Sequence, residues 1–314
     1  MKHILDKKNV VGIAHGEKWI NGKSTGKKAV LVFVEKKEPV ENLDPDDIIE
    51  KKIDGLPTDV VGKTGTITAG LTLKPRIRAK PSTSRPKSAG NKPRKTLLRA
   101  AKVYRAKTTK RIRPVMGGIS VSHKKVSAGT IGALFRDRKK RVVMLSNNHV
   151  LANTNKSRIG DAIYQPGSYD SAIRPQNVVG GLMAFVKLRN GANQDSAIAS
   201  VKTAYLPTIN RIGRPRGIRA AKLRLKVKKS GRTTRLTKGR IIATKGTFRV
   251  EYGRTSYIIK NCIVTTYMSE GGDSGSLLLD YKNRAVGLLF AGSNRVTLHN
   301  PIGPIIKQYK LKFL

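Results

Sequence analysis

Hydrophobic positions in this chain fall in short segments separated by glycine, asparagine and proline, which is typical of β-strands. Residues 9–15 (NVVGIAH) and 27–37 (KKAVLVFVEKK) predict two strands joined by a glycine-rich turn, and hence a hairpin. LDPDDIIEKKIDG has an aspartate before a proline, acidic residues next and a glycine at its end, which predicts a short helix. PTDVVGKTGTITAG predicts a further β segment. Residues 1–70 are therefore expected to form a small α/β domain.

From residue 114 the chain contains two successive sets of short β segments. The first includes GGISVSH, SAGTIGALFRD, RVVMLSNNHVLA and QDSAIASVK, and the second includes GRIIATKGTFRVEY, TSYIIKNCIVTTY, GSLLLD and AVGLLFAGS. Two all-β sets of similar length predict a mainly β fold with a double antiparallel β-barrel, at about 114–205 and 206–314. The tail PIIKQYKLKFL predicts a final helix packed on the second barrel.

Charge divides the chain into two unlike parts. It has 64 Lys and Arg against 19 Asp and Glu, a net charge of +45, yet residues 1–70 are almost balanced. Residues 71–113 contain no acid and are rich in Lys, Arg, Pro and Ser, which predicts a flexible basic linker. Within it, TLLRAAKVYRAK has the alternative of a short basic helix on a partner.

Several classes of protein are disfavoured by composition. The only cysteine, Cys262, excludes an intramolecular disulfide. No apolar run has the length of a signal peptide or a membrane span, so we expect a location inside a cell or a virion and no membrane association. VVGKTGT has Pro57 where a phosphate-binding loop needs glycine, and the five histidines and one cysteine show no metal-ligand spacing. No cofactor and no metal are predicted.

Three motifs supply the groups that acyl transfer needs. In GGDSGS, glycines flank Ser274 and favour a tight turn that exposes its hydroxyl, which predicts a nucleophile. His149 in LSNNHVLA is the candidate general base, and Asp195, before the apolar segment SAIASV, is the candidate that orients it. Taken singly, each has a plain alternative: a Gly-Ser turn, a structural histidine and a solvated aspartate at the start of a strand.

The strings NNHV, DSAIA and GGDSGS together resemble trypsin-like serine peptidases of the chymotrypsin fold over residues 114–314. Within that family the chain resembles a bacterial and phage group that carries a small N-terminal domain before the protease. The resemblance implies a serine endopeptidase that takes protein or peptide substrates. It also implies that the backbone N–H groups of Gly272 and Ser274 form the oxyanion hole.

The resemblance also implies the position of the specificity pocket. Met268 is expected near the base of the pocket and Phe290, Ala291 and Gly292 at its edge, with Ser269 and Glu270 also among the pocket residues. The strand through Gly292 is expected to pair with the substrate backbone. A small or apolar side chain before the scissile bond is expected, and attraction of Lys or Arg by Glu270 remains an alternative. Secreted relatives bury a freed N-terminus against the acid before the serine, here Asp273, but RPVMGGISVSH departs from their pattern, and activation by that route is not expected.

The basic stretch 211–240 has no acid and predicts a polyanion partner, most simply nucleic acid bound without sequence preference. The candidate contacts are Arg211, Arg214, Arg216, Arg219, Lys226, Lys228, Lys229 and Arg232. A solvated basic face is the plain alternative. A protease-fold protein without catalytic activity, associated with nucleic acid or a phage particle, is the competing function. The linker composition further suggests that the enzyme cuts itself there.

Overall fold

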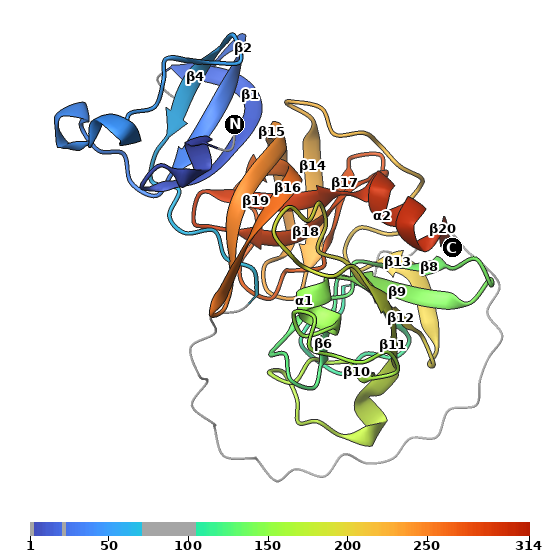
Figure 1. Ribbon diagram of the computed structural model, residues 1–314. Coiled ribbons are helices and arrows are strands. Elements are labelled where there is room, and N and C mark those ends of the chain that lie inside the picture. Colours follow the sequence, from blue (N-terminus) through green and yellow to red (C-terminus); the bar gives the residue numbers. More distant parts are fainter. Residues whose placement is uncertain (1–2, 21–22, 71–104) are drawn as a thin grey trace.

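The computed structural model describes residues 3–20, 23–70 and 105–314, and strands account for most of its regular structure (Figure 1). The strands form one ten-stranded sheet, one eight-stranded sheet and one two-stranded pair. The predicted mainly β class is therefore confirmed. The helices of the described residues are short: α1 Asn148–Leu151, α2 Ile302–Tyr309, and the 3-10 turns His3–Asp6, Val40–Asn42, Pro45–Asp47 and Pro175–Asn177.

The first barrel is the eight-stranded sheet. In spatial order its strands are β20 Lys312–Phe313, β8 Ala133–Arg136, β9 Val142–Ser146, β12 Ala197–Ser200, β11 Val178–Phe185, β10 Ala162–Tyr164, β6 Ser120–His123 and β7 Gly129–Thr130. β7 pairs with β6 and runs on into β8, which pairs with β9, so one continuous segment joins both ends of the sheet. Apolar side chains of these strands, including Val121, Ile131 and Met144, fill the interior.

The second barrel belongs to the ten-stranded sheet. In spatial order the strands are β14 Lys226–Gly231, β17 Leu277–Asp280, β18 Ala285–Gly292, β19 Val296–Pro301, β16 Thr255–Thr266, β15 Arg235–Tyr252, β1 Val10–Ile20, β2 Lys23–Val34, β4 Leu56–Val61 and β3 Lys52–Ile53. β14 pairs with β15 as well as with β17, which closes six of these strands into a barrel. The separate pair consists of β13 Tyr205–Ile209 and β5 Val115–Gly117.

The N-terminal part continues the second barrel's sheet. β1 and β2 form the predicted hairpin, and β1 also pairs with β15, with Gly12 opposite Phe248 (Figure 1). The short helix predicted for residues 1–70 is wrong: the segment forms only the 3-10 turn Pro45–Asp47, and no α-helix lies in 3–20 or 23–70. This turn buries no side chain, and a short helix without a buried apolar face is unstable in water.

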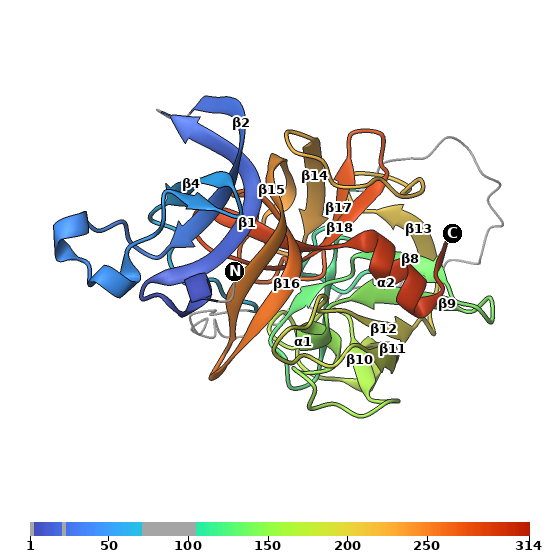
Figure 2. The same cartoon turned by 45° about the horizontal axis from the view of Figure 1, so that its top comes forward.

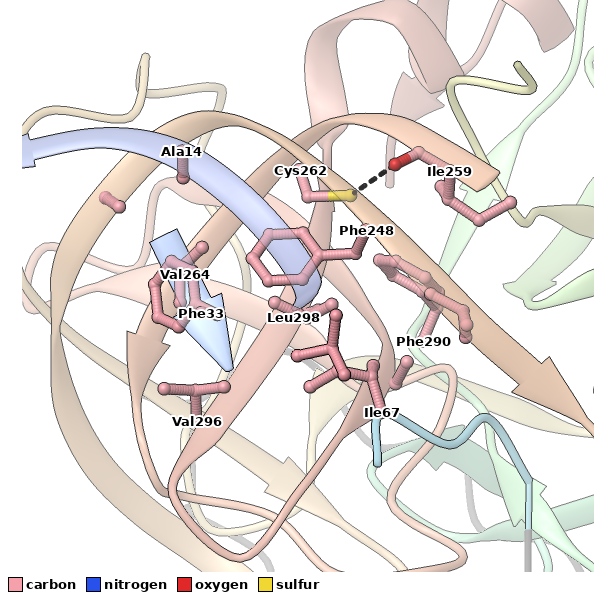
Figure 3. Packing of buried hydrophobic residues seen from close by; sticks show 14 of the residues in the cluster. Ala14, Phe33, Ile67, Phe248, Ile259, Cys262, Val264, Phe290, Val296 and Leu298 are labelled. Carbon is pink, nitrogen blue, oxygen red and sulfur yellow. Dashed lines mark hydrogen bonds between the residues drawn. The ribbon is translucent and has the colours of Figure 1, made fainter. Parts of the chain in front are cut away.

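One hydrophobic cluster joins the N-terminal strands to the second barrel. Figure 3 shows Phe33 of β2 and Phe248 of β15 packed together, with ring centroids 5.2 Å apart. Ile67 joins the same cluster from the segment after β4 and is fully buried. Cys262 also lies in it, and burial raises the pKa of its thiol. Residues before 70 therefore share a core with the barrel.

The last residues of the predicted linker pack on the barrels, which differs from the expectation of a flexible segment. Residues 71–104 of the predicted linker lie outside the described residues, whereas residues 105–113 pack on the barrels. Ala106 exchanges backbone bonds with the Asn210 amide, and Thr108 donates its hydroxyl to the Arg232 carbonyl over 2.7 Å.

The C-terminal helix forms as predicted, but it contacts both barrels. α2 contributes Ile302 and Ile305 to a cluster that also contains Phe135 of β8 and Leu288 of β18. Both views place it beside β8 (Figure 2), where β20 pairs. Among the helices of the described residues, none has the length and apolar character needed to cross a bilayer.

The contact of Gly12 with Phe248 gives a test of the shared core. A Cβ atom at position 12 would lie 2.0 Å from Cδ1 of the buried Phe248 ring, so Gly12→Ala forces the ring or the strand to move. We expect a loss of about 1–3 kcal/mol in the free energy of unfolding, measured with urea. Gly303→Ala in α2 is the control, because nothing lies within 4 Å of its Cβ position. Equal stability of Gly12→Ala and wild type would contradict the packing.

Candidate active site

His149 and Asp195 are brought together by strand pairing in the first barrel. β9 and β12 are antiparallel with Ser146 opposite Ala197, so residues just after β9 and just before β12 lie at the same end. The imidazole Nδ1 of His149 lies 2.5 Å from Oδ2 of Asp195, and the backbone N–H of His149 donates to Oδ1 over 3.3 Å. This is the hydrogen bond that fixes the tautomer of a general base.

The surroundings hold the aspartate in place and exclude water. Asp195 is fully buried, its N–H donates to Oδ1 of Asn300 over 2.8 Å, and its carbonyl accepts from Asn147 over 2.7 Å. Tyr252 of β15 packs edge-on against the His149 ring at 5.7 Å. Burial, and next the charge of Asp195, raises the pKa of the Tyr252 phenol, which therefore stays neutral. No motif in the sequence pointed to Tyr252.

Ser274 lies on a turn between the barrels and is 5% exposed. Its Oγ donates to the Phe290 carbonyl over 3.4 Å, while Nε2 of His149 has no hydrogen-bond partner among the described residues. The serine and imidazole are therefore not bonded to each other in this conformation. A long nucleophile–base distance is common before substrate binds. Ser274 and His149 both lie near Gly70. Gly70 lines one hollow with Ser274, and a Cβ atom at Gly70 would lie 3.9 Å from Cδ2 of His149.

The turn itself requires glycine. Gly272 has φ +95° and Gly275 has φ +93°, both in the left-handed region. A Cβ at Gly275 would lie 2.1 Å from Oγ of Ser146 and 2.3 Å from the carbonyl oxygen of Thr130. Thr130 in turn donates two bonds to carbonyls of this loop, from its Oγ1 to Gly272 and from its N–H to Ser274, both over 2.8 Å. The first barrel therefore fixes the loop that carries the serine.

The backbone N–H groups predicted for the oxyanion hole are not used elsewhere. Within the described part of the chain, no hydrogen bond has the N–H of Gly272 or of Ser274 as donor. Two unused donors flanking a nucleophile can stabilise an oxyanion.

A buried ion pair fixes the residue next to the serine. Nζ of Lys229 lies 2.9 Å from Oδ2 of Asp273, and both side chains are fully buried. The same carboxylate accepts bonds from the N–H groups of Glu270, Thr233 and Thr234 and from the Thr234 hydroxyl. Burial lowers the pKa of Lys229, and the Asp273 charge opposes that shift.

Lys229 and Arg232 correct the prediction for the basic stretch. Both were expected among the polyanion contacts, but Lys229 bonds to Asp273, and Arg232 forms a two-bond ion pair with the buried Asp170. A charged side chain inside a protein needs such a partner, and these partners are distant in sequence. Arg214, Arg216 and Lys226 are exposed, whereas Arg211, Arg219 and Lys228 are half-buried.

A hollow of about 350 Å³ adjoins Ser274. It contains four of the predicted pocket residues: Ser269, Glu270, Ala291 and Gly292. The side chains of Met268 and Phe290 lie instead in hydrophobic clusters. The sequence missed the other lining residues, which include Thr66, Thr68 and Gly70 from the segment after β4, and Tyr267 and Asn294 at the rim. No group of three or more His, Cys, Asp or Glu residues in the described ranges is placed to hold a metal.

Comparison with known proteins gives distant likenesses only. No protein-family model matches the chain, and no curated protein matches it. Among solved structures, Thermobifida fusca Protease A is 20% identical and aligns over 63% of this chain and 97% of its own, with a TM-score of 0.49. Cellulomonas bogoriensis chymotrypsin is 23% identical over 64% and 98%, with a TM-score of 0.48. An alpha-lytic protease homologue, N4, is 17% identical over 64% and 99%, at 0.49. At these scores we base the function on the geometry of the site alone.

The ion pair beneath the serine loop gives a stability test. Lys229→Met leaves the buried Asp273 carboxylate without a cation, and we expect a loss of about 3–5 kcal/mol in the free energy of unfolding. Asp273→Asn in the same chain removes the uncompensated charge and should restore part of that loss. Denaturant unfolding measures both. Lys228→Met on the same strand is the control, since Lys228 is half-buried and contacts the Tyr281 ring at 5.7 Å, and it should cost under about 1 kcal/mol.

Proposed function

We propose that this chain is a serine endopeptidase with Ser274 as nucleophile, His149 as general base and Asp195 as the residue that orients it. The observation that carries the proposal is the His149–Asp195 pair, with Nε2 of the imidazole left unbonded, beside a rigid glycine turn that carries Ser274. A buried carboxylate on Nδ1 leaves Nε2 as the proton acceptor.

The proposed reaction proceeds through an acyl-enzyme. Oγ of Ser274 attacks the carbonyl carbon of the scissile bond while its proton passes to Nε2 of His149, and Asp195 stabilises the imidazolium. The N–H groups of Gly272 and Ser274 donate to the oxyanion. The imidazolium then protonates the leaving amine, and water hydrolyses the ester by the reverse proton path. The hollow lined by Ser269, Ala291 and Gly292 supports a small side chain before the scissile bond.

A fluorophosphonate probe tests the triad. We expect wild type to be labelled at Ser274, and Ser274→Ala and His149→Ala to remain unlabelled, with mass spectrometry locating the adduct. Asp195→Asn should lower the rate of hydrolysis by about 10⁴-fold, because the imidazole then takes the wrong tautomer. Ser256→Ala, at an exposed serine of β16, is the control and should be labelled like wild type.

The same labelling experiment distinguishes a serine peptidase from the alternative function. The alternative is a protease-fold protein without catalytic activity, associated with nucleic acid or a phage particle, and no labelling under any condition would support it. The intact masses also test self-cleavage in the basic linker, which we propose from its composition; residues 71–104 lie outside the described residues. Only full-length chain in an active preparation would contradict self-cleavage.

We also propose that the cationic surface holds the enzyme near nucleic acid, inside a cell or a virion. Exposed Lys226 borders a hollow of about 480 Å³ with Arg224, Arg240 and Trp19, and the Arg240 guanidinium lies 5.4 Å from the Trp19 ring centroid. Glu17 in the same hollow pairs with Arg224 over 2.8 Å. Among the described residues, Lys226 and Arg240 form no ion pair, so both can contact phosphates.

Salt dependence tests this binding. Affinity for a random-sequence DNA duplex should fall linearly on a plot of log K against log salt. Replacing Arg214, Arg216 and Lys226 by alanine should reduce the slope by about 3, close to one per lost phosphate contact. Fluorescence anisotropy at several salt concentrations measures it. A triple replacement of exposed Lys27, Lys51 and Lys52, in the part of balanced charge, should leave the slope unchanged. Affinity that does not fall with salt would contradict phosphate binding.

A further inference from the structure

The segment 67–70, after β4, lies between the end of β15 and the end of β18, next to the serine. On one side, the N–H of Thr68 donates to the Gly292 carbonyl over 3.0 Å, and the N–H of Gly292 donates to the Thr68 carbonyl over 3.1 Å. On the other side, the N–H of Glu251 donates to the Ile67 carbonyl over 2.9 Å, and the N–H of Ala69 donates to the Glu251 carbonyl over 2.8 Å. The segment is thus bonded as a strand on both edges.

The bonds between Thr68 and Gly292 occupy the strand edge with which a peptide substrate would pair. An extended peptide binds a protease by adding a strand to an exposed edge, through backbone N–H and C=O groups. Gly292 is at the end of β18, in which the Phe290 carbonyl accepts from Oγ of Ser274, and the N–H and carbonyl of Gly292 both bond to Thr68. A peptide cannot pair with Gly292 while Thr68 occupies both groups.

The segment also runs towards the catalytic residues. Thr66, Thr68 and Gly70 all line the hollow beside Ser274, and a Cβ atom at Gly70 would lie 3.9 Å from Cδ2 of His149. Gly70 has φ +95°, so the chain turns at that point in a conformation that a side chain would strain.

Side-chain packing anchors one end of the segment. Ile67 is fully buried in the cluster with Phe290 and Leu298, as Figure 3 shows, whereas the Thr68 side chain is exposed. Thr68 is therefore held by its backbone bonds, and one substitution there can weaken the strand without removing a buried side chain.

We propose that Ile67–Gly70 is a tethered peptide in the substrate position of the Ser274 site, and that a peptide substrate must displace it to bind. This inference rests on the proposed function. The residues Thr68, Ala69 and Gly70 are small, so the site is built around an extended peptide with small residues ahead of the catalytic serine.

Competition between a peptide and a small probe tests the proposal on the full chain. The probe is a fluorophosphonate small enough to react without pairing to Gly292. The competitor is the peptide amide Thr-Ile-Thr-Ala-Gly-NH2, which copies residues 66–70. In wild type, 1 mM peptide should leave the labelling rate of Ser274 unchanged. In Thr68→Pro, which lacks the N–H that bonds to Gly292, it should slow labelling by roughly fivefold or more.

Matched variants make the result decisive. Val40→Pro carries the same substitution at an exposed residue that does not line the hollow, the first of the 3-10 turn Val40–Asn42, whose N–H bonds to neither Gly292 nor Glu251, and it should behave as wild type. Ile67→Ala weakens the anchor and should behave as Thr68→Pro, so it serves if the proline variant does not fold; circular dichroism checks both. Peptide that slows wild type as strongly as the variants, or slows none of them, overturns the tethered strand. Absence of labelling in every chain contradicts the proposed function instead, which is a separate result.

Discussion

The ion pair between Lys229 and Asp273 is the constraint on which the geometry around the serine depends. Two opposite charges without solvent exposure are tolerated only when each is fully bonded, and Asp273 meets that condition with Lys229, three backbone N–H groups and one hydroxyl. Because Asp273 precedes Ser274, those bonds fix the turn that carries Ser274. The loop is therefore shaped by an interior charge that came from the chain's most basic stretch.

The source of that ammonium group bears on activation. A trypsin-like enzyme that buries a freed N-terminus against this acid depends on proteolysis for its final shape. Here a lysine side chain makes the bond, and Val115, in the segment where such a terminus would arise, donates its N–H to Ala204 in a parallel strand pair. The serine loop can therefore form in an uncut chain. Under the proposed function, control of activity then lies elsewhere, and the bonds of Thr68 with Gly292 provide a place for it.

Local pattern was enough to predict much of the fold and the three central residues. Alternating apolar segments predicted the N-terminal hairpin and both β sets, and short motifs singled out His149, Asp195 and Ser274, two of which the structure joins by a 2.5 Å contact. The predictions for Lys229 and Arg232 were wrong because their partners are distant in sequence. The cations at 229 and 232 looked like surface charge because their carboxylates lie 44 and 62 residues away. The predicted helix after Asp44 had suitable end signals, but the turn that forms there, Pro45–Asp47, buries no side chain.

The N-terminal residues show why sequence alone could not assign them a role. Their strands look like a small separate unit, since charge balance and hairpin signals stop near residue 70. In space, β1 extends the sheet of the second barrel, Phe33 packs on Phe248, and Ile67 is buried in the same cluster. Because Ile67 is anchored in this cluster, the next residue, Thr68, lies where its backbone bonds to Gly292, at the strand edge beside Ser274. The packing that stabilises the N-terminal part is thus the same packing that positions its last residues in the hollow beside Ser274.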